Sequence, residues 1–427
     1  MSSIKDKKIE FKSSVFTGNK LTCTGCGACS QVCTKQAIKM EEDSEGFLFP
    51  KIDPVLCVKC GKCDRVCPVV NSHQENFGYS QQCYIVTNVD NNYSRNCATV
   101  GVATMLAESI INQGGYVYGV FLDETEWRAK HICINKESAI GMIKNSKYVQ
   151  SNTRNTFSEV KKRLLNDELV LFTGTPCQIA GLKSFLHKDY DNLFTLDLIC
   201  HGTYSYKLLQ QEVEYWKLKY KGEIKNFRFR SKEQSPWNIG GIINFDVYKN
   251  GSNYMHVERH GSCSPIYRCY AYSGDGKNYT LRESCYSCSF RSDSRYGDIT
   301  VGDAWGLAYS HPEVFTKENC KSGISLVLIN STKGNRLFAK IHKNLFVKEV
   351  SHSEAFNQEA LNPTFRIIPK ERAEIYAKYD KVEWGALIEN ILHVNFDVLY
   401  KQYKMKQLKM KIKDLIKTVI FYKLWRK

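Results

Sequence analysis

The sequence lacks the long apolar runs that would carry the chain into a membrane or along a secretory route. No window approaches ~18 consecutive apolar residues, the length expected of a transmembrane helix. The N-terminal residues 1–14, MSSIKDKKIEFKSS, contain no apolar stretch resembling a signal peptide. We therefore expect a cytoplasmic protein.

Two common nucleotide-binding patterns are also missing. The chain contains no G-x-G-x-x-G dinucleotide fingerprint and no P-loop, so spacing alone indicates no nucleotide site. It has no long-period repeat and no low-complexity segment. Hydrophobic residues at 43% and charged residues at 24% are typical of a soluble globular protein, and 427 residues suggest two or three domains.

Cysteine is too scarce for a disulfide scaffold. The chain has 18 cysteines among 427 residues, about 4.2%, which is below the roughly 8–10% of short disulfide-rich chains. A chain of this length also forms a hydrophobic core without disulfides. We therefore expect the cysteines in a reducing compartment, as metal ligands, catalytic thiols or buried core residues.

The net charge of +16 is concentrated at one end of the chain. Residues 401–427 contain ten basic side chains and one acid, Asp414, and so contribute +9, whereas the other 400 residues carry only +7. A nucleic-acid-binding domain would spread basic residues over its own surface. The distribution therefore does not favour nucleic acid as a partner.

Eight cysteines near the N-terminus follow one duplicated frame. Each set reads C-x2-C-x2-C-x3-C, and the second set begins 34 residues after the first. This frame binds 4Fe–4S clusters, with three close cysteines on one cluster and the fourth crossing to the other. A pair of four-cysteine zinc sites is the alternative. The predicted ligand sets are Cys23, Cys26, Cys29 and Cys67 for one cluster, and Cys57, Cys60, Cys63 and Cys33 for the other.

The middle of the chain alternates between predicted strands and helices. Leu169–Phe172 and Phe194–Ile199 are near-continuous apolar segments, typical of strands buried on both faces. Because helical patterns surround them, we expect an α/β domain with a mostly parallel sheet. An antiparallel insert is predicted around the turn pair Asn250-Gly251. The other predicted elements are strands at Cys83–Val89, Tyr116–Leu122, Ile242–Tyr248, Ser252–Val257, Asp298–Val301 and Ser325–Ile329, and helices at Val100–Asn112, Phe157–Asn166, Gln178–Leu186 and Leu208–Tyr220.

Four later cysteines form a second predicted group. Cys177 follows the turn Gly174-Thr175-Pro176 at the start of a helix, where the helix dipole favours a thiolate. Cys200 ends the next strand, so parallel pairing of the two strands would bring both cysteines to the carboxyl edge of the sheet. Cys285 and Cys288 form a C-x2-C pair. The four make a candidate thiolate site; a buried strand cysteine and a structural zinc half-site are the alternative.

Several short motifs occur in the order typical of one family. The motifs are Ser146–Ser151 (SKYVQS), Gly174–Gln178 (GTPCQ), Ile199–Gly202 (ICHG), Cys285–Cys288 (CYSC) and Asp298–Gly306 (DITVGDAWG). With these motifs and the ferredoxin frame, the chain resembles, over about residues 20–335, the beta subunits of coenzyme F420 hydrogenases and dehydrogenases, including bacterial relatives with a fused ferredoxin domain.

The resemblance implies FAD beside a third 4Fe–4S cluster, with Cys177, Cys200, Cys285 and Cys288 as ligands of that cluster. Where the family has Ser-Gly-Gly before the first helix, this chain has Thr99-Val100-Gly101. The cofactor-binding residues that the resemblance and the helix start imply are Lys147, Gln150, Ser151, Gly174, Thr175, Pro176 and Asp303. Six cysteines receive no role as ligands: Cys83, Cys97, Cys133, Cys263, Cys269 and Cys320.

His201 is the candidate for proton delivery because an imidazole titrates near neutrality. A hydrogen bond from His201 to a cluster sulfide is the alternative. We thus expect an iron–sulfur flavoprotein oxidoreductase that passes electrons between its clusters and a small substrate or carrier through FAD, since a flavin connects one- and two-electron chemistry. Its partner would be an electron-donor protein or a reduced carrier. The alternatives are an electron-transfer subunit without a substrate of its own and a redox sensor.

The last residues, 400–427, are predicted to form a basic helix with one apolar face. A helix of this kind with terminal aromatic residues suits peripheral contact with the inner face of a membrane; packing on the body or docking to an acidic partner are the alternatives. The predicted apolar face consists of Met405, Leu408, Ile412, Leu415, Val419 and Tyr422. The expected order is a loose arm (1–20), a ferredoxin domain (21–70), two parts of a beta-subunit-like domain (83–156 and 157–335), a helical extension (336–399) and the basic tail (400–427).

Overall fold

The computed structural model describes residues 12–71, 80–95, 97–232, 241–249, 253–271, 273–362 and 366–425. The predicted turn pair Asn250-Gly251 and most of the N-terminal arm lie outside these residues. The chain divides into two compact units. The first comprises Met1–Lys207, Arg228–Ile239 and Leu281–Ile368, and the second comprises Leu208–Phe227, Gly240–Thr280 and Pro369–Lys427.

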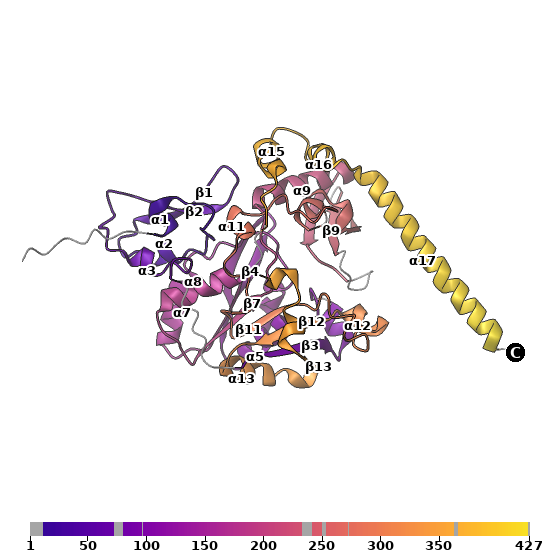
Figure 1. Ribbon diagram of the computed structural model, residues 1–427, viewed down its shortest axis with the longest axis horizontal. Helices are drawn as coiled ribbons and strands as arrows, with labels where there is room; N and C mark the ends of the chain where they lie inside the picture. Colours follow the sequence, from indigo (N-terminus) through magenta and orange to yellow (C-terminus); the bar gives the residue numbers. More distant parts are fainter. Residues whose placement is uncertain are drawn as a thin grey trace, which may run out of the picture. The chain divides into compact units, whose positions relative to one another are not determined.

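A mixed eight-stranded sheet is the centre of the first unit (Figure 1). Its strands are β3 (Gln82–Asn88), β4 (Tyr116–Asp123), β5 (Arg128–Ile134), β6 (Val170–Gly174), β7 (Leu193–Leu198), β11 (Ile299–Asp303), β12 (Ser325–Ile329) and β13 (Leu345–Val350). Their order is β13-β3-β12-β11-β7-β6-β4-β5. The four strands from β11 to β4 pair in parallel, and the pairs outside them are antiparallel.

The α/β class predicted from the sequence is confirmed, and the sheet is parallel only in its central part. Two antiparallel strands, β5 and β13, had no counterpart among the predicted elements. β5 follows β4 through a turn of only four residues, and a connection this short permits only antiparallel pairing. β13 lies within the segment 336–399, which was expected to be helical throughout.

Helices cover both faces of the sheet, because successive side chains of a strand point to opposite faces. On one face, Leu171 of β6 packs in a core cluster with residues of α5 (Val102–Ile111) and α13 (Thr332–Ala339). On the other face, Val170 and Phe172 pack against α7 (Thr156–Leu165) and α8 (Pro176–Leu186). The remaining short helices of this unit are α4 (Asn91–Arg95), α6 (Ile140–Ile143), α11 (Glu283–Tyr286), α12 (Lys317–Ser322) and α14 (His352–Ala355).

The ferredoxin-like region forms part of the first unit. It contains α1 (Ser14–Thr17), α2 (Ala28–Val32), β1 (Ile38–Glu42), β2 (Leu48–Ile52) and α3 (Lys62–Arg65), and its two strands pair antiparallel. Helices α2 and α3 each begin after a glycine with a left-handed backbone, Gly27 at φ 81° and Gly61 at φ 70°. This conformation costs glycine little, and it turns the chain just before a predicted ligand.

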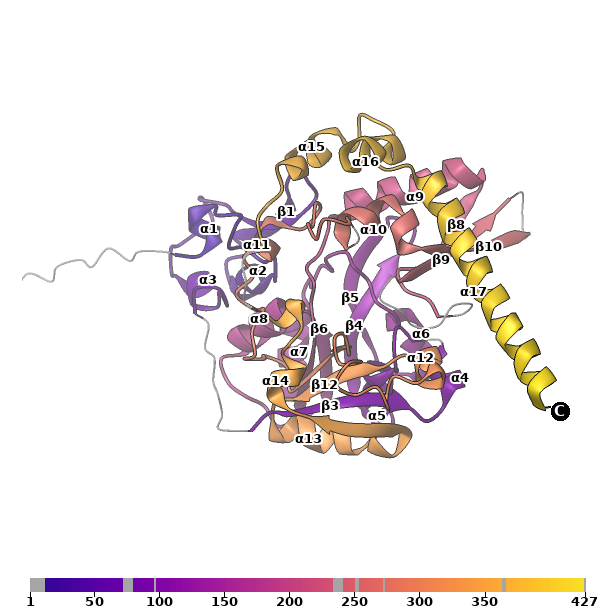
Figure 2. The ribbon, with the colours of Figure 1, turned by 45° about the vertical axis from the view of Figure 1, so that its right-hand side comes forward.

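The second unit is built on a three-stranded sheet of order β10-β9-β8 (Figure 2). Its elements are α9 (Tyr206–Tyr220), β8 (Glu223–Arg228), β9 (Ile242–Tyr248), β10 (Tyr254–His260), α10 (Pro265–Tyr270), α15 (Lys370–Lys378), α16 (Trp384–Leu392) and α17 (Phe396–Trp425). β9 and β10 pair antiparallel, which agrees with the predicted insert.

The C-terminal helix α17 is held at its start. Arg259 lies over the ring of Tyr400 at 4.1 Å, and His260 stacks on Tyr403 at 4.7 Å between ring centroids. Beyond these contacts the apolar side chains Met405, Leu408, Met410 and Ile412 are exposed. Because Met410 lies outside the predicted stripe, the apolar residues are not confined to one face. Among the described residues, no helix is both long enough and apolar enough to cross a membrane.

Candidate iron–sulfur sites

The eight N-terminal thiols form the two groups that the ligand frame predicts. Burial raises the pKa of Cys29 well above its usual value, and the charges of Cys26, Cys23 and Cys67 raise this pKa further. Burial also raises the pKa of Cys63 to about 11, with added repulsion from Cys33 and Cys57. Each group therefore joins three thiols of one repeat with one thiol of the other. We call them set 1 (Cys23, Cys26, Cys29 and Cys67) and set 2 (Cys33, Cys57, Cys60 and Cys63).

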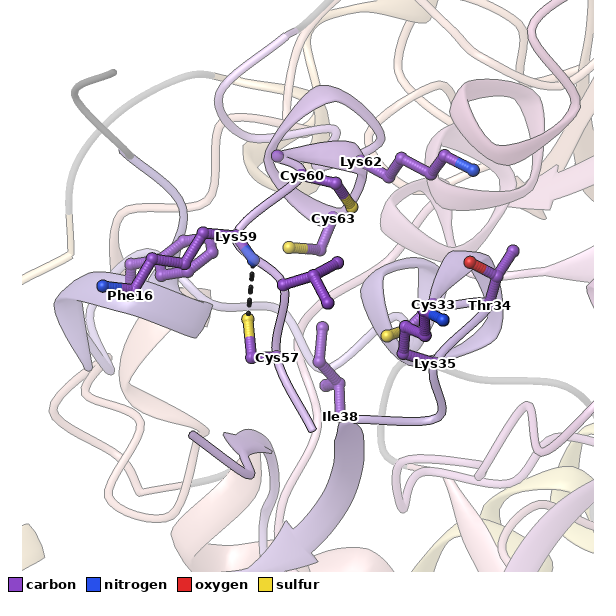
Figure 3. A pocket seen from close by; sticks show the side chains of 12 residues that line it. Phe16, Cys33, Thr34, Lys35, Ile38, Cys57, Lys59, Cys60, Lys62 and Cys63 are labelled. Carbon is purple, nitrogen blue, oxygen red and sulfur yellow. Dashed lines mark hydrogen bonds between the residues drawn. The ribbon is translucent and has the colours of Figure 1, made fainter. Parts of the chain in front are cut away.

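Set 2 lines one cavity of the ferredoxin-like region (Figure 3). Backbone amides point at its sulfurs: Lys59 N donates to Cys57 Sγ at 3.4 Å, and Ala37 N donates to Cys33 Sγ at 3.3 Å. Hydrogen bonds of this kind stabilise a thiolate more than a thiol. The donor set, the amides and the cavity thus fit a 4Fe–4S cluster.

Set 1 lies where glycines allow close approach. A Cβ on Gly25, which has φ 68°, would meet Leu48 O at 2.9 Å, and one on Gly27 would meet Thr153 Oγ1 at 2.6 Å. Among the described residues, no three His, Cys, Asp or Glu side chains converge as tightly as a single metal ion requires. Glycine at these two positions therefore lets the loop of set 1 pack closely against Leu48 and Thr153.

The four later cysteines also come together, as set 3 (Cys177, Cys200, Cys285 and Cys288). β6 and β7 are parallel neighbours, so Cys177 and Cys200, which follow them, both lie at the carboxyl edge of the sheet. Burial raises the pKa of Cys288, with further repulsion from Cys285, Cys177 and Cys200. Burial raises the pKa of Cys177 to about 11 and that of Cys200 to about 12. Buried thiols of this kind stay protonated at neutral pH unless a metal centre takes their protons.

Local backbone geometry brings together the chain segments that carry the cysteines of set 3. Gly202 has φ 122°, and a Cβ there would lie 3.2 Å from that of Cys285, so this approach depends on glycine. Thr175 caps α8 in a capping box with Gln178, and its Oγ1 lies 3.1 Å from Cys177 Sγ. Thr175 and Pro176 therefore organise the start of α8 and hold the thiol of Cys177 there.

Set 1 and set 3 lie next to each other across α8. A Cβ on Gly181 of α8 would lie only 3.0 Å from Cys26 Sγ. The hydroxyl of Thr24, the residue between Cys23 and Gly25, hydrogen-bonds to the Cys177 thiol and lowers the pKa of that thiol. Since Cys29 of set 1 packs in one cluster with Cys63 of set 2, the three sets follow the order 2, 1, 3.

Arg282 connects the ferredoxin-like region to the sheet domain. It is 1% exposed, and it donates hydrogen bonds to Cys23 O at 2.9 Å, Leu48 O at 3.0 Å and Gln150 Oε1 at 2.9 Å. Gln150 in turn donates to Thr24 O at 2.6 Å. Gln150, expected to contact a flavin, thus bonds to the ferredoxin-like region. Arg282 was not among the predicted site residues, because its partner Cys23 is 259 positions away in sequence.

Ser151 and Gly174 are also involved in protein contacts. Ser151 is buried; its Oγ lies 3.1 Å from His131 Nδ1 and accepts a hydrogen bond from Gln178 Nε2 at 3.0 Å. Gly174 is the last residue of β6, and a Cβ there would lie 3.3 Å from Gln178 Cβ. Both residues support the segment that leads to Cys177.

His201 follows Cys200 and receives hydrogen bonds from Arg366. Arg366 Nη1 donates to His201 O at 2.7 Å, and Nη2 lies 3.4 Å from His201 Nδ1. A guanidinium only donates, so Nδ1 acts as the acceptor and the imidazole carries its proton on Nε2. His201 thus lies directly beside Cys200 of set 3, with the guanidinium of Arg366 against its ring.

A second group of polar residues surrounds Asp303. The carboxylate of Asp303 pairs with Arg230 and accepts a hydrogen bond from Thr99 Oγ1 at 3.1 Å. Lys232 is 5% exposed and donates to the carbonyl oxygens of Thr99 and Ser322. Burial lowers the pKa of Lys232 to about 7. Arg230 and Lys232 lay outside the predicted site, because no motif marks them.

Lys147 lies on a segment next to the polar residues around Asp303. Tyr148 packs edge-on against Phe229 with 5.7 Å between ring centroids, so the segment with Lys147 is adjacent to the segment with Arg230. Lys147 donates to Lys144 O, and burial lowers its pKa to about 7. Three cationic side chains and one carboxylate therefore lie on adjoining segments near the start of α5.

The six other cysteines are separate from these sets. Cys83, Cys97, Cys263 and Cys269 are buried, and Cys133 and Cys320 are partly buried. Burial raises the pKa of Cys83 to about 11 and raises that of Cys269 well above the usual value. They resemble core residues, not ligands.

Two known families match parts of the chain. Residues 167–354 match the family described as the C terminus of the coenzyme F420 hydrogenase/dehydrogenase beta subunit, and residues 22–71 match the 4Fe-4S dicluster domain. The chain thus joins an iron–sulfur dicluster domain to a C-terminal domain of the beta-subunit kind, as the sequence motifs predicted. It is an iron–sulfur protein related to these subunits.

One solved structure is similar to much of this chain. A chain in the F420-reducing NiFe hydrogenase complex from Methanosarcina barkeri is similar, with 18% identity and a TM-score of 0.41, over 70% of this chain and 90% of that chain. No curated protein matches the chain.

Proposed function

We propose that the protein is an iron–sulfur flavoprotein oxidoreductase that passes electrons between ferredoxin-type clusters and a small substrate or carrier. The observation that carries this proposal is the sequence of three neighbouring thiol sets, with Cys26 of set 1 against Gly181 of α8 and Cys177 of set 3 at the start of the same helix. Sets 1 and 2 would hold the two clusters of the dicluster domain, and set 3 a third. Bound clusters supply one-electron transfer.

We propose that FAD binds beside the group around Asp303. Among the described residues, Lys147, Arg230 and Lys232 lie on adjoining segments beside Asp303, and basic side chains of this kind bind the phosphates of an anionic dinucleotide. The start of α5, capped by Gly101 at φ 95°, adds a helix N-terminus that favours phosphate. The residues fit the group, and a bound flavin supplies the exchange between one- and two-electron chemistry.

We propose His201 as the residue that delivers a proton, with a hydrogen bond to a sulfide of set 3 as its other role. Arg366 orients the ring of His201 through Nδ1, beside Cys200 of set 3. Replacement by His201→Ala distinguishes the roles: loss of turnover with full iron and flavin indicates proton delivery, and loss of iron indicates support of set 3.

The test of the main proposal is quantitation of iron, acid-labile sulfide and flavin in anaerobically purified protein. About twelve irons per chain and one FAD are expected. About eight irons would remove the third site, and fewer would contradict the dicluster assignment. Turnover by the purified chain alone, in a donor screen with ferredoxin, deazaflavin and pyridine nucleotides, separates an enzyme from a relay protein. Clusters without flavin and without turnover would favour the relay.

We propose that α17 touches an anionic membrane surface from the cytoplasmic side. Its exposed lysines and the exposed apolar side chains of Met405, Leu408 and Ile412 support this proposal. Liposome flotation with and without residues 400–427 tests it. Recovery with anionic vesicles that depends on these residues is expected, whereas equal recovery of both forms would contradict membrane contact.

A further inference from the structure

Large apolar side chains are exposed directly beside set 2. Val55 is 90% exposed, Val58 is 60% exposed and Leu56 is 49% exposed, and all three lie in the loop that leads to Cys57 and Cys60. Cys60 is itself exposed. Single exposed apolar residues are ordinary on a protein surface, but three on one short loop form a patch, and patches of this kind mark interaction sites.

Three basic side chains lie beside this patch, which also carries the carboxylate of Asp53. Lys35, Lys59 and Lys62 line the same cavity as the thiols of set 2, and all three are exposed. Lys62 extends away from the thiols (Figure 3).

A groove next to the cavity continues this basic surface. It has a volume of about 400 Å³, and Lys62, Arg65, Lys161 and His187 line it together with the apolar Phe185. The groove lies between the ferredoxin-like region and α7 and α8, all within the first unit. Cationic side chains therefore border the patch along the α2–α3 side.

From this surface we infer that an acidic electron-carrier protein docks on the face made by Val55, Leu56, Val58 and the surrounding cations Lys35, Lys59, Lys62 and Arg65, which we call the set 2 face. The inference rests on the proposed function, because the face serves electron transfer only if set 2 holds a cluster. An apolar centre inside a charged rim is the usual anatomy of a protein interface. The positive charge at the edge of the patch favours a partner with a negatively charged surface, because complementary charges meet across an interface.

The transfer itself needs no bond to form or break. One electron leaves the reduced carrier, which becomes oxidised, and enters the centre held by set 2. From there sets 1 and 3 lie in succession toward the carboxyl edge of the sheet. The exposed Cys60 makes set 2 the point of the series that comes closest to a docked protein.

Binding of an acidic two-cluster 4Fe–4S ferredoxin to the immobilised full-length holoprotein tests the inference under anaerobic conditions. We expect an affinity that falls steeply when salt rises from about 50 mM to about 300 mM. The variant Lys35→Glu/Lys62→Glu reverses the charge of two residues at the edge of the patch and should raise Kd about tenfold or more at low salt. The variant Val55→Ser/Val58→Ser should raise Kd, and the salt dependence of Kd should stay the same. Arg336→Glu, an exposed cation on α13, is the matched control and should change Kd less than about twofold.

Iron content and the midpoint potential of each variant separate docking from cluster loss. A loss of binding with full iron and an unchanged potential supports the set 2 face. Equal effects of Arg336→Glu and the double charge reversal, or no binding of the ferredoxin at low salt by protein with full iron, would overturn it. Such a result leaves the proposed function intact, because dithionite would still reduce the clusters; that function fails instead if the iron content of the wild-type protein falls below eight per chain.

Discussion

The Nε atom of Arg282 donates a hydrogen bond to the backbone carbonyl of Cys23 at 2.9 Å, between two residues 259 positions apart in sequence. The same guanidinium lies 4.0 Å from the ring centroid of Phe49 on β2. Arg282 also lies three positions before Cys285, and its charge lowers the pKa of Cys177 and of Cys285. One buried cation therefore holds set 1 in place and stabilises the thiolates of set 3.

Arg282→Lys should loosen the ferredoxin-like region while keeping the positive charge. Lysine cannot reproduce the planar fork that reaches Cys23 O, Leu48 O and Gln150 together. Hydrogen bonds made by charged groups are worth about 1.5–3 kcal/mol each, so we expect faster hydrogen exchange and proteolysis within residues 22–71. Arg282→Met should in addition lower the reduction potentials of the clusters, because a nearby positive charge favours the reduced state. Arg336→Lys on α13 is the control, and equal proteolysis of both lysine variants would contradict the role of Arg282.

Gly181 has a separate consequence for set 1. Gly181→Ala adds a Cβ 3.0 Å from the Sγ of Cys26, and this atom sits on a helix that cannot move freely. We expect displacement of Cys26 and a fall in iron content from about twelve to about eight per chain. Gly141→Ala is the matched control, since Gly141 is also helical and a Cβ there meets nothing within 4 Å. Unchanged iron in Gly181→Ala would show that set 1 does not depend on this contact.

The grouping of the twelve thiols could be predicted from the sequence because the spacing of the cysteines and the order of the strands determine it, whereas their role as ligands stays a prediction. The duplicated cysteine frame specifies sets 1 and 2, and the parallel pairing expected of two buried strands brings Cys177 and Cys200 to one edge. The structure adds what spacing does not encode. Arg282, Arg230 and Arg366 act through partners that are distant in sequence, and no local pattern marks such contacts. β5 escaped prediction because its sequence RAKHICI places the polar His131 at a buried position and the apolar Ile132 at a partly exposed one, which obscures the alternation.

The pH dependence of stability should reveal the buried ammonium of Lys232. Burial lowers its pKa to about 7, whereas the same group in the unfolded chain titrates near 10.5. Between these values the unfolded chain binds more protons than the folded one, so stability rises with pH by up to roughly 1.4 kcal/mol per unit. Lys232→Met removes this contribution. In thermal unfolding between about pH 7.5 and 9.5, the stability of the wild type should therefore increase with pH relative to that of the variant. If the stability of both proteins depended on pH in the same way, the low pKa of Lys232 would be refuted.

Glu212 is a carboxylate of the second unit with no exposed surface. It accepts hydrogen bonds from Trp216 Nε1 at 2.8 Å, Ser264 Oγ at 2.7 Å, Ile266 N at 2.9 Å and Trp384 Nε1 at 2.9 Å. These four donors come from α9, α10 and α16, so one side chain joins three helices of the unit. Burial raises the pKa of Glu212, and the hydrogen bonds oppose that shift.

Glu212→Gln keeps the size of the side chain but replaces an accepting oxygen with a donating amide. At least one of the four donors then faces another donor, and two do so if the amide nitrogen takes the place of Oε2; each buried unsatisfied group costs about 1–3 kcal/mol. We expect a loss of about 2–5 kcal/mol in the free energy of unfolding of the second unit, measured by denaturant unfolding. Glu214→Gln, two residues further along α9 and exposed, is the control and should change stability by less than about 0.5 kcal/mol. Because every partner of Glu212 belongs to the second unit, the iron content of the first should stay the same; a matching loss of iron in Glu212→Gln would contradict the independence of the two units.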